Sequence, residues 1–445
     1  MPAPTTPLNR DPGNDRGKDS DGTGTPAAGP SRWPLLVIFL TVFIDLLGFG
    51  IVLPVMPRQA EPYLSELRLS PVAGGAVIGV LFSVFSLMQF LFSPVWGRVS
   101  DRIGRRPMLL LSLLGSVVFY ALYGYAVTFP ADRAAVAIGL MLLSRIGAGI
   151  AGASVGTAAA VIADCTTPEN RARGMALIGI AFGAGFTLGP LIAYFGLALF
   201  DRQPWGVGAL ASLLSLVALL IAVFVFEETR RPGSRTAKEF VSVSRTKAVL
   251  SMPSIGALVL TYFLSIFAFA NFEATLARLT ESAFGMDDTD NFLVFAFIGV
   301  MLMIAGGLYR PLAKRLPETT LLAAGVALMI VGLAAVGVVA WRVQAGPPAA
   351  ALLRTVFYAA SAVAVAGFAF VNPSVSALIS KRSDPDRQGE VLGVNQSFAS
   401  LGRILGPFLG SVLFSIRPAG TLPFVAAVSI LAVVAALLPR IGRRG

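Results

Sequence analysis

Residues 97–107 read GRVSDRIGRRP, and this short stretch carries five charged side chains between two apolar runs. The runs at 72–95 and 107–128 each contain about twenty residues, the length a helix needs to cross a hydrocarbon core roughly 30 Å thick. Similar runs recur along the chain, which is 55% hydrophobic and 13% charged and has a mean hydropathy of +0.76. A soluble domain carries about 25% charged residues. The sequence therefore predicts an all-α membrane protein in which this stretch is a surface loop.

We expect twelve transmembrane helices in two six-helix repeats. The longest polar connection, residues 227–250, separates an N-terminal half at 34–226 from a C-terminal half at 251–440. Residues 1–33 are rich in Pro, Gly and Asp and predict a disordered cytoplasmic tail, and 441–445 form a second short tail. The expected spans are 34–57, 72–95, 107–128, 135–163, 172–197, 205–226, 253–280, 291–309, 319–341, 348–379, 389–415 and 421–439.

The placement of arginine and lysine predicts the orientation. Most of these residues lie in the tails and in the loops that follow the even-numbered spans. By the positive-inside rule, these segments and both termini lie in the cytoplasm, and we expect the cell's inner (cytoplasmic) membrane. This distribution accounts for the net charge of +11 without nucleic acid as a partner. The opposite loops hold only Arg58, Arg68, Arg133, Arg202, Arg342 and Arg417.

The chain contains no histidine and one cysteine, Cys165. It therefore lacks the usual proton shuttle and metal ligand, the Ser-His nucleophile pair, and any intrachain disulfide. Two segments, GAGIAG (147–152) and GASVG (152–156), fit enzyme patterns. Both fall inside an expected span, where no strand precedes a helix and no histidine can activate Ser154. We expect no enzyme activity, cofactor or metal.

Two segments resemble each other at a constant offset of 217 residues, 166–193 and 383–410. Duplicated six-helix halves are typical of secondary transporters, in which one repeat rocks against the other around a midplane site. The offset pairs Gly185 with Gly402, Gly189 with Gly406 and Pro190 with Pro407.

The loop at 97–107 fits the pattern G-x3-D-R-x-G-R-R, and on this pattern the chain resembles the major facilitator superfamily. Gly97 permits close helix approach, Gly104 suits a turn with positive φ, and Asp101 can accept from helix N-terminal amides or from an arginine. The resemblance implies a gating motif that latches the two halves in one orientation. The matching residues are Gly97, Asp101, Arg102, Gly104, Arg105 and Arg106.

The resemblance extends over nearly the whole chain. The segments FIDLLGFGIVLPVMP (43–57), SRIGAGIAGASVGTAAAVIAD (144–164) and FGAGFTLGP (182–190) are similar to spans of twelve-span drug/proton antiporters, above all the tetracycline-resistance exporters. This likeness implies that Gly185, Gly189 and Pro190 form an antiporter motif. Residues 319–341 hold no acid, where tetracycline exporters are expected to use one, so the substrate stays open.

Charged residues at membrane depth are the candidate proton-coupling groups. Asp45 and Glu273 are the acids well inside expected spans, and Arg145 is the deep cation of the fourth span. An isolated acid at that depth costs roughly 2.5–3.5 kcal/mol on insertion scales. An Asp45–Arg145 pair would lower this cost, and a proton arriving at Asp45 would break the pair. Two alternatives remain: a static ion pair that fixes packing, and a Glu273 that simply reaches the outer interface.

Five neutral polar side chains also fall at membrane depth. As a set they predict an apolar substrate cavity with a few orienting hydrogen bonds, whereas each alone is compatible with an interhelical hydrogen bond. They are Gln89, Asn271, Asn372, Asn395 and Gln396.

Together these observations predict a monomeric, proton-coupled transporter that exports small amphipathic, drug-like compounds by alternating access. A metabolite uptake symporter or a uniporter is the alternative within transport. A ligand sensor that binds without transport is the alternative from another class. The expected partners are a small-molecule substrate, protons and the lipid bilayer.

Overall fold

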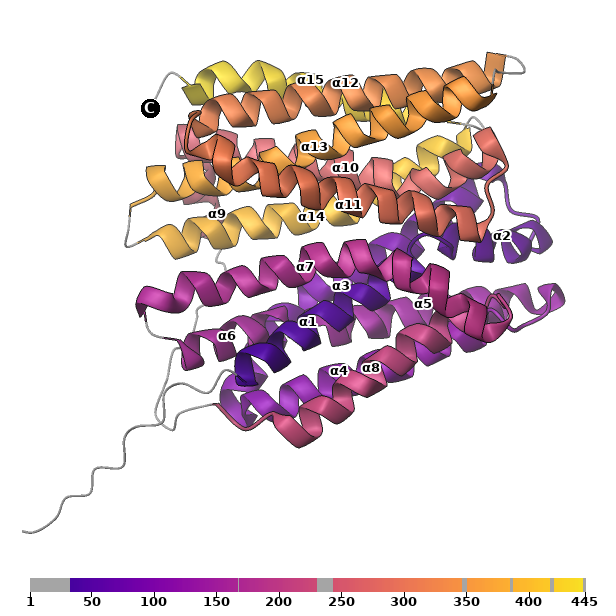
Figure 1. Cartoon of the computed structure of the whole chain (residues 1–445), viewed down its shortest axis with the longest axis horizontal. Helices are drawn as coiled ribbons and strands as arrows, with labels where there is room; N and C mark the ends of the chain where they lie inside the picture. Colours follow the sequence, from indigo (N-terminus) through magenta and orange to yellow (C-terminus); the bar gives the residue numbers. More distant parts are fainter. Residues whose placement is uncertain are drawn as a thin grey trace, which may run out of the picture. The chain divides into compact units, whose positions relative to one another are not determined.

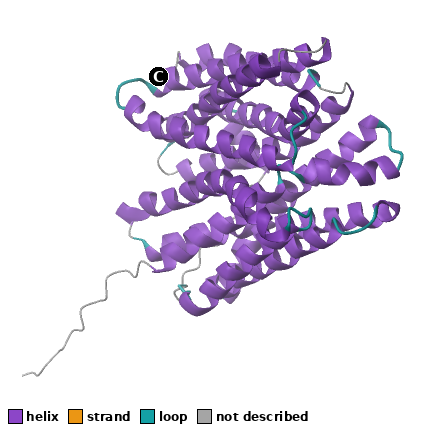
Figure 2. Ribbon diagram, turned by 45° about the vertical axis from the view of Figure 1, so that its right-hand side comes forward, coloured by secondary structure: helices purple, strands orange, loops and turns teal. Residues whose placement is uncertain are grey.

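The computed structural model describes residues 33–166, 168–229, 243–345, 350–384, 387–416 and 420–442. These residues are helical almost throughout and contain no strand (Figure 2). Among the described residues, eleven helical segments are long and apolar enough to cross a membrane, counting α5 and α6 as one, and the bent pair α1–α2 makes up to twelve. The all-α transmembrane fold is therefore confirmed. The helices (Figure 1) are α1 Trp33–Val52, α2 Met56–Glu66, α3 Pro71–Ile103, α4 Arg105–Ala126, α5 Ala134–Ala151, α6 Val155–Cys165, α7 Pro168–Gly196, α8 Gly206–Val225, α9 Val243–Leu250, α10 Pro253–Phe284, α11 Asp288–Ala313, α12 Glu318–Ala345, α13 Ala350–Arg382, α14 Gln388–Ile416 and α15 Leu422–Gly442.

The first span is broken where the sequence predicts one helix at 34–57. Helix α1 ends at Val52, and α2 begins at Met56 after a bend of 46°. Pro54 and Pro57 explain the break, because proline lacks the backbone N–H that would continue the helical hydrogen bonds and its ring clashes with the preceding turn. Helix α2 is therefore a separate short helix at one end of the bundle, and its side chains point in other directions than a continuation of α1 would give.

The fourth span is also interrupted. A short 3₁₀ turn, Gly152–Ser154, separates α5 from α6. Side chains of neighbouring helices donate to the carbonyls around this turn: Ser112 Oγ to Ala151 O (2.7 Å), Gln89 Nε2 to Gly152 O (2.8 Å) and Ser93 Oγ to Ala153 O (3.3 Å). The break is stable because carbonyls released from the helical ladder find other donors.

The polar connection between the halves contains structure of its own. Residues 226–229 follow α8, and α9 occupies 243–250 before α10 begins at Pro253. The expected linker at 227–250 thus ends in a short helix. Its middle, 230–242, lies outside the described residues, as do residues 1–32 of the expected tail at 1–33 and residues 443–445 of the expected tail at 441–445.

The internal repeat of the sequence is present in the packing. A methyl group on Gly185 would lie 2.7 Å from Leu46 Cβ, and one on Gly189 would lie 3.0 Å from Leu47 O, so α7 packs closely against α1. In the second half, a methyl group on Gly406 would lie 2.6 Å from Phe267 O, so α14 packs on α10 in the same way. Glycine is required at these positions because the backbones approach too closely for a side chain. Pro190 is buried beside them and its Cδ lies near Gly50.

The two halves meet along α3 with α14 and along α7 with α11. On the first pair the contacts recur every fourth residue of α3, which places them on one helix face. In the second pair, Gly299 of α11 lies against Thr187 of α7. The end of the bundle that carries α2 is called the α2 end below, and the end that carries Gly104 and α9 is called the linker end. The α3–α14 contacts join Gly75 to Ser411, Gly79 to Phe408 and Ser83 to Ile404.

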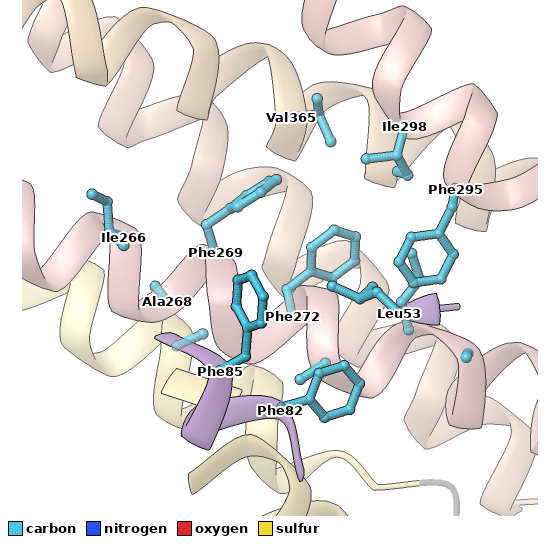
Figure 3. Packing of buried hydrophobic residues seen from close by; sticks show 14 of the residues in the cluster. Leu53, Phe82, Phe85, Ile266, Ala268, Phe269, Phe272, Phe295, Ile298 and Val365 are labelled. Carbon is cyan, nitrogen blue, oxygen red and sulfur yellow. The ribbon is translucent and has the colours of Figure 1, made fainter. Parts of the chain in front are cut away.

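Apolar side chains of both halves form one continuous core across this seam. Figure 3 shows Phe82 and Phe85 of α3 beside Phe269 and Phe272 of α10. The stacked rings of Phe269 and Phe368, with centroids 3.9 Å apart, extend the aromatic packing to α13. The core therefore continues between the halves instead of ending at each half's surface.

Candidate functional site

The loop between α3 and α4 is organised by Arg105. Gly104 has φ +112°, as its position in the motif predicts. Arg105 Nη1 lies 2.6 Å from Asp101 Oδ1, and its Nε lies 3.2 Å from Asp164 Oδ2 at the end of α6. The Arg105 side chain is only 11% exposed, so these charge-assisted contacts are partly desolvated. Asp101 thus pairs with an arginine, the second of its two expected roles.

The amides that begin α4 are bound by a residue that the sequence did not single out. Glu228 follows α8 and accepts from the backbone N–H groups of Arg105 (2.9 Å) and Arg106 (3.1 Å). A carboxylate at this position satisfies two orphan donors and complements the positive end of the helix dipole. No motif spacing relates these residues, which are more than 120 positions apart in the chain.

The remaining motif residues lie at the surface of the linker end. Arg106 donates to Val223 O at 2.8 Å, and Arg102 is exposed. Gly97 was expected to allow close helix approach, but a methyl group there would meet no atom within 4 Å. In the conformation of this structure, the face of α3 that carries Gly97 is therefore not covered by another helix at the linker end.

Arg145 is 2% exposed and lies deep in α5. Its Nε donates to Leu81 O at 3.4 Å, and its guanidinium carbon lies 4.7 Å from the centre of the Phe85 ring. The Tyr120 and Tyr123 side chains lie close enough to act electrostatically on the Arg145 guanidinium. Asp45 belongs to α1, but its side chain lies outside the described part of the chain, so the expected Asp45–Arg145 pair stays a prediction.

Glu273 occupies a position well inside α10 and keeps part of its surface accessible. Among the described side chains, Arg403 of α14, which is also partly exposed, is a charged group that acts electrostatically on Glu273. Arg403 in turn lies within range of Tyr262, whose hydroxyl donates to Asn372 Oδ1 at 2.8 Å. The structure therefore brings together an acid, a guanidinium, a phenol and an amide in the C-terminal half.

The five neutral polar residues divide between two environments. Gln89 bonds the broken fourth span, and Asn271 is buried and donates to Pro423 O at 3.2 Å, which bridges α10 and α15. Asn395 is buried, and no described atom bonds its Oδ1. Asn372 and Gln396 are exposed. Of the five, Asn372 is thus the one that joins the Glu273–Arg403 group through a described bond.

A pocket of about 470 Å³ lies at the α2 end between the two halves. Its wall includes Arg58 and Glu61 of α2, Arg278 and Glu281 of α10, and Phe414 of α14. Arg278 donates to Ser415 Oγ at 3.0 Å and stacks over Phe414 at 4.7 Å. The pocket is therefore a charged space to which both halves contribute.

Known relatives cover most of this chain. A mouse protein, major facilitator superfamily domain-containing protein 10, is 28% identical over 435 residues, which cover 87% of this chain and 89% of the relative. The class E tetracycline resistance protein of Escherichia coli is 30% identical over 387 residues, covering 86% and 88% respectively. The crystal structure of the human organic anion transporter MFSD10 (TETRAN) superposes with a TM-score of 0.61 at 26% identity, covering 92% of this chain and 99% of that one.

The family assignment agrees with these relatives. Residues 38–407 and 343–444 match the Major Facilitator Superfamily. The apolar spans and the related glycine contacts of the two halves agree with this assignment. The chain is a multi-pass membrane transporter of the major facilitator superfamily, and not an enzyme.

Proposed function

We propose that this transporter couples proton movement to the export of small amphipathic compounds by alternating access. The observation that carries the proposal is Glu273, a partly exposed carboxylate well inside a spanning helix and within electrostatic range of Arg403. Protonation of Glu273 changes the charge of this pair, so it can link a proton to a change in conformation or ligand. Asp45, in the first helix of the other half, is proposed as the second proton-carrying acid.

The proposed orientation puts the linker end and both termini in the cytoplasm of a cell with an inner membrane. The arginine-rich loop between α3 and α4 then faces the cytoplasm, as the positive-inside rule requires. One chain supplies both halves of the seam, which supports a monomer as the working unit.

A second candidate, the transport of organic anions, is favoured by the charges at depth. Arg145, Arg278 and Arg403 all lie within helices of the bundle and are buried or partly buried. Arg278 and Arg403 are accessible enough to meet a ligand, and a guanidinium binds carboxylates bidentately. The human relative whose structure superposes here is described as an organic anion transporter.

The charge of the substrate determines whether substrate and proton move in the same direction or in opposite directions. A cationic substrate competes with the proton for Glu273, so the two move in opposite directions. An anion at Arg403 competes with the Glu273 carboxylate, so the anion binds better when Glu273 is protonated and the two move together. The direction of proton movement therefore separates an antiporter for cations from a symporter for anions, and binding without exchange of labelled ligand would support a sensor.

Everted membrane vesicles with an imposed pH gradient test the proposal. We expect uptake of amphipathic dyes that an uncoupler abolishes, and a loss of at least about tenfold in Asp45→Asn and Glu273→Gln, since each removes a proposed proton-carrying group. Asp132→Asn, at an exposed acid of the α2 end, is the matched control. Uncoupler-sensitive transport that survives in both deep variants would refute the proton-coupling role.

A further inference from the structure

We propose that Arg58 is a positioning residue that latches the α2 end closed, and that its ion pairs must break each time the transporter opens there. This inference rests on the proposed alternating access. It assigns a residue to the outer gate, whereas the gating motif between α3 and α4 lies at the opposite end of the bundle.

Arg58 joins the two halves directly. Its Nε lies 3.7 Å from Glu281 Oε1 of α10 and 3.6 Å from Asp288 Oδ1 of α11. Its Nη1 donates to Met286 O, in the turn between those helices, at 3.3 Å. One guanidinium therefore binds three acceptors on the C-terminal half.

Helix α2 is attached to the N-terminal half, so Arg58 moves with that half. The Tyr63 hydroxyl donates to Phe129 O at 2.9 Å, and Gln59 Nε2 donates to Pro204 O at 3.0 Å. Gln59 Oε1 also accepts from the Tyr123 hydroxyl at 2.8 Å. These bonds fix α2 on its own half, whereas Glu281 and Asp288 belong to α10 and α11. A rigid-body separation of the halves at this end must therefore break the contacts of Arg58.

The described hydrogen bonds and ion pairs between the two halves lie in the middle of the seam and at the α2 end. Ser83 donates to Ile404 O near the middle of the seam, and Arg202 donates to Thr289 at the α2 end. At the linker end, the open surface at Gly97 shows that the same helix is not covered there. The latch thus belongs to a state that is closed at the α2 end.

The ion pairs are suited to repeated opening because they are weak. The side chains of Arg58, Glu281 and Asp288 are 39%, 45% and 29% exposed. Water and salt screen the pair with Glu281 most strongly, whereas the Asp288 Oδ1 atom that faces Arg58 is itself buried. Arg58 and Glu281 also line the 470 Å³ pocket between the halves, so release of the latch would widen that pocket toward the outside.

Distance measurements between spin labels test the latch without any substrate or proton gradient. The only cysteine, Cys165, is replaced by serine in the full chain. Label pairs at Asp132 and Arg342 report on the α2 end, and pairs at Leu111 and Leu316 report on the linker end; all four sites are exposed. The purified protein is measured in lipid nanodiscs by double electron–electron resonance.

In Arg58→Gln we expect the ratio of closed to open populations at the α2 end to fall about two- to fivefold, the range of a partly exposed ion pair. The linker-end distance should shorten in the same sample. The double variant Glu281→Gln with Asp288→Asn should reproduce this shift, and adding Arg58→Gln should change nothing more. Raising the salt concentration should shift the wild type and leave Arg58→Gln unchanged.

Arg68→Gln is the matched control, because Arg68 lies at the same end with no described side-chain bond. Arg58→Lys keeps the charge and should give an intermediate shift, which guards against misfolding as the cause. An Arg58→Gln distribution equal to that of Arg68→Gln, or additive effects in the triple variant, would overturn the latch. A wild type with a single fixed distance at both ends would instead contradict alternating access itself.

Discussion

Glu228 shows how a side chain outside the recognised motif holds the motif in place. Its two oxygens accept from the first amides of α4, and a methyl group on Gly104 would collide with one of them. The positive φ of Gly104 and the carboxylate of Glu228 therefore belong to one arrangement, in which the turn brings the helix N-terminus onto the acid.

Replacing Glu228 with alanine should lower the free energy of unfolding by about 0.5–2 kcal/mol, because two helix N-terminal donors lose their acceptor. Glu228→Gln should cost less, since the amide oxygen still accepts one bond. The neighbouring Glu227 is exposed, so Glu227→Ala is the matched control. Thermal unfolding of detergent-purified protein measures the difference, and equal Tm values for Glu227→Ala and Glu228→Ala would contradict the capping role.

At the scale of helices, the pairing of α3 with α14 can be continued past the residues that are in contact in this conformation. The paired positions 75–411, 79–408 and 83–404 run antiparallel, so each step along α3 moves back along α14. Continued to the linker end, the register places Gly97 opposite Glu390, one turn from Gly393. Both glycines face open space here. These faces are therefore available to close against each other when the α2 end opens.

Gly97→Leu should leave folding intact, because a Cβ atom at this position would meet no atom within 4 Å in this state. It should reduce transport about 5- to 150-fold, since an overpacked contact of about 1–3 kcal/mol would oppose closure at the linker end. Gly139→Leu, on a face that is equally open, is the control. Transport rate at equal amounts of folded protein is the measurement, and wild-type rates in Gly97→Leu would show that the two faces never meet.

At the scale of the whole molecule, the two halves are joined by a seam with its own apolar core, so the covalent connection is not what holds them together. We expect a chain cut within 230–242 to assemble when both pieces are expressed together, because each piece keeps its glycine contacts and the seam remains. Co-purification through a tag on one piece measures this, with a piece lacking α14 as the control. If the two pieces never associate, the covalent linker is needed to hold the halves together.

The sequence predicted the spans, the two halves and the positive-φ turn at Gly104, because these depend on local apolar length and on a compact motif. It placed span boundaries less well at Pro54 and at Gly152, where neighbouring helices decide whether a break is tolerated. The capping role of Glu228, the grouping of Glu273 with Arg403 and the partners of Arg58 were not predicted. Each depends on a contact between residues far apart in the chain, for which spacing carries no signal.

The bend at 53–55 makes the place of Arg58 depend on the number of residues before it. Helix α2 begins after this turn, and each residue inserted or removed there would rotate the helix by about 100°. Arg58 would then point away from Glu281 while every charge remained in the chain. A single-residue deletion at the turn would thus disable the latch, whereas a substitution of Leu53 or Val55 that keeps Pro54 would preserve the bend. The length of this turn and its proline therefore together determine where Arg58 lies.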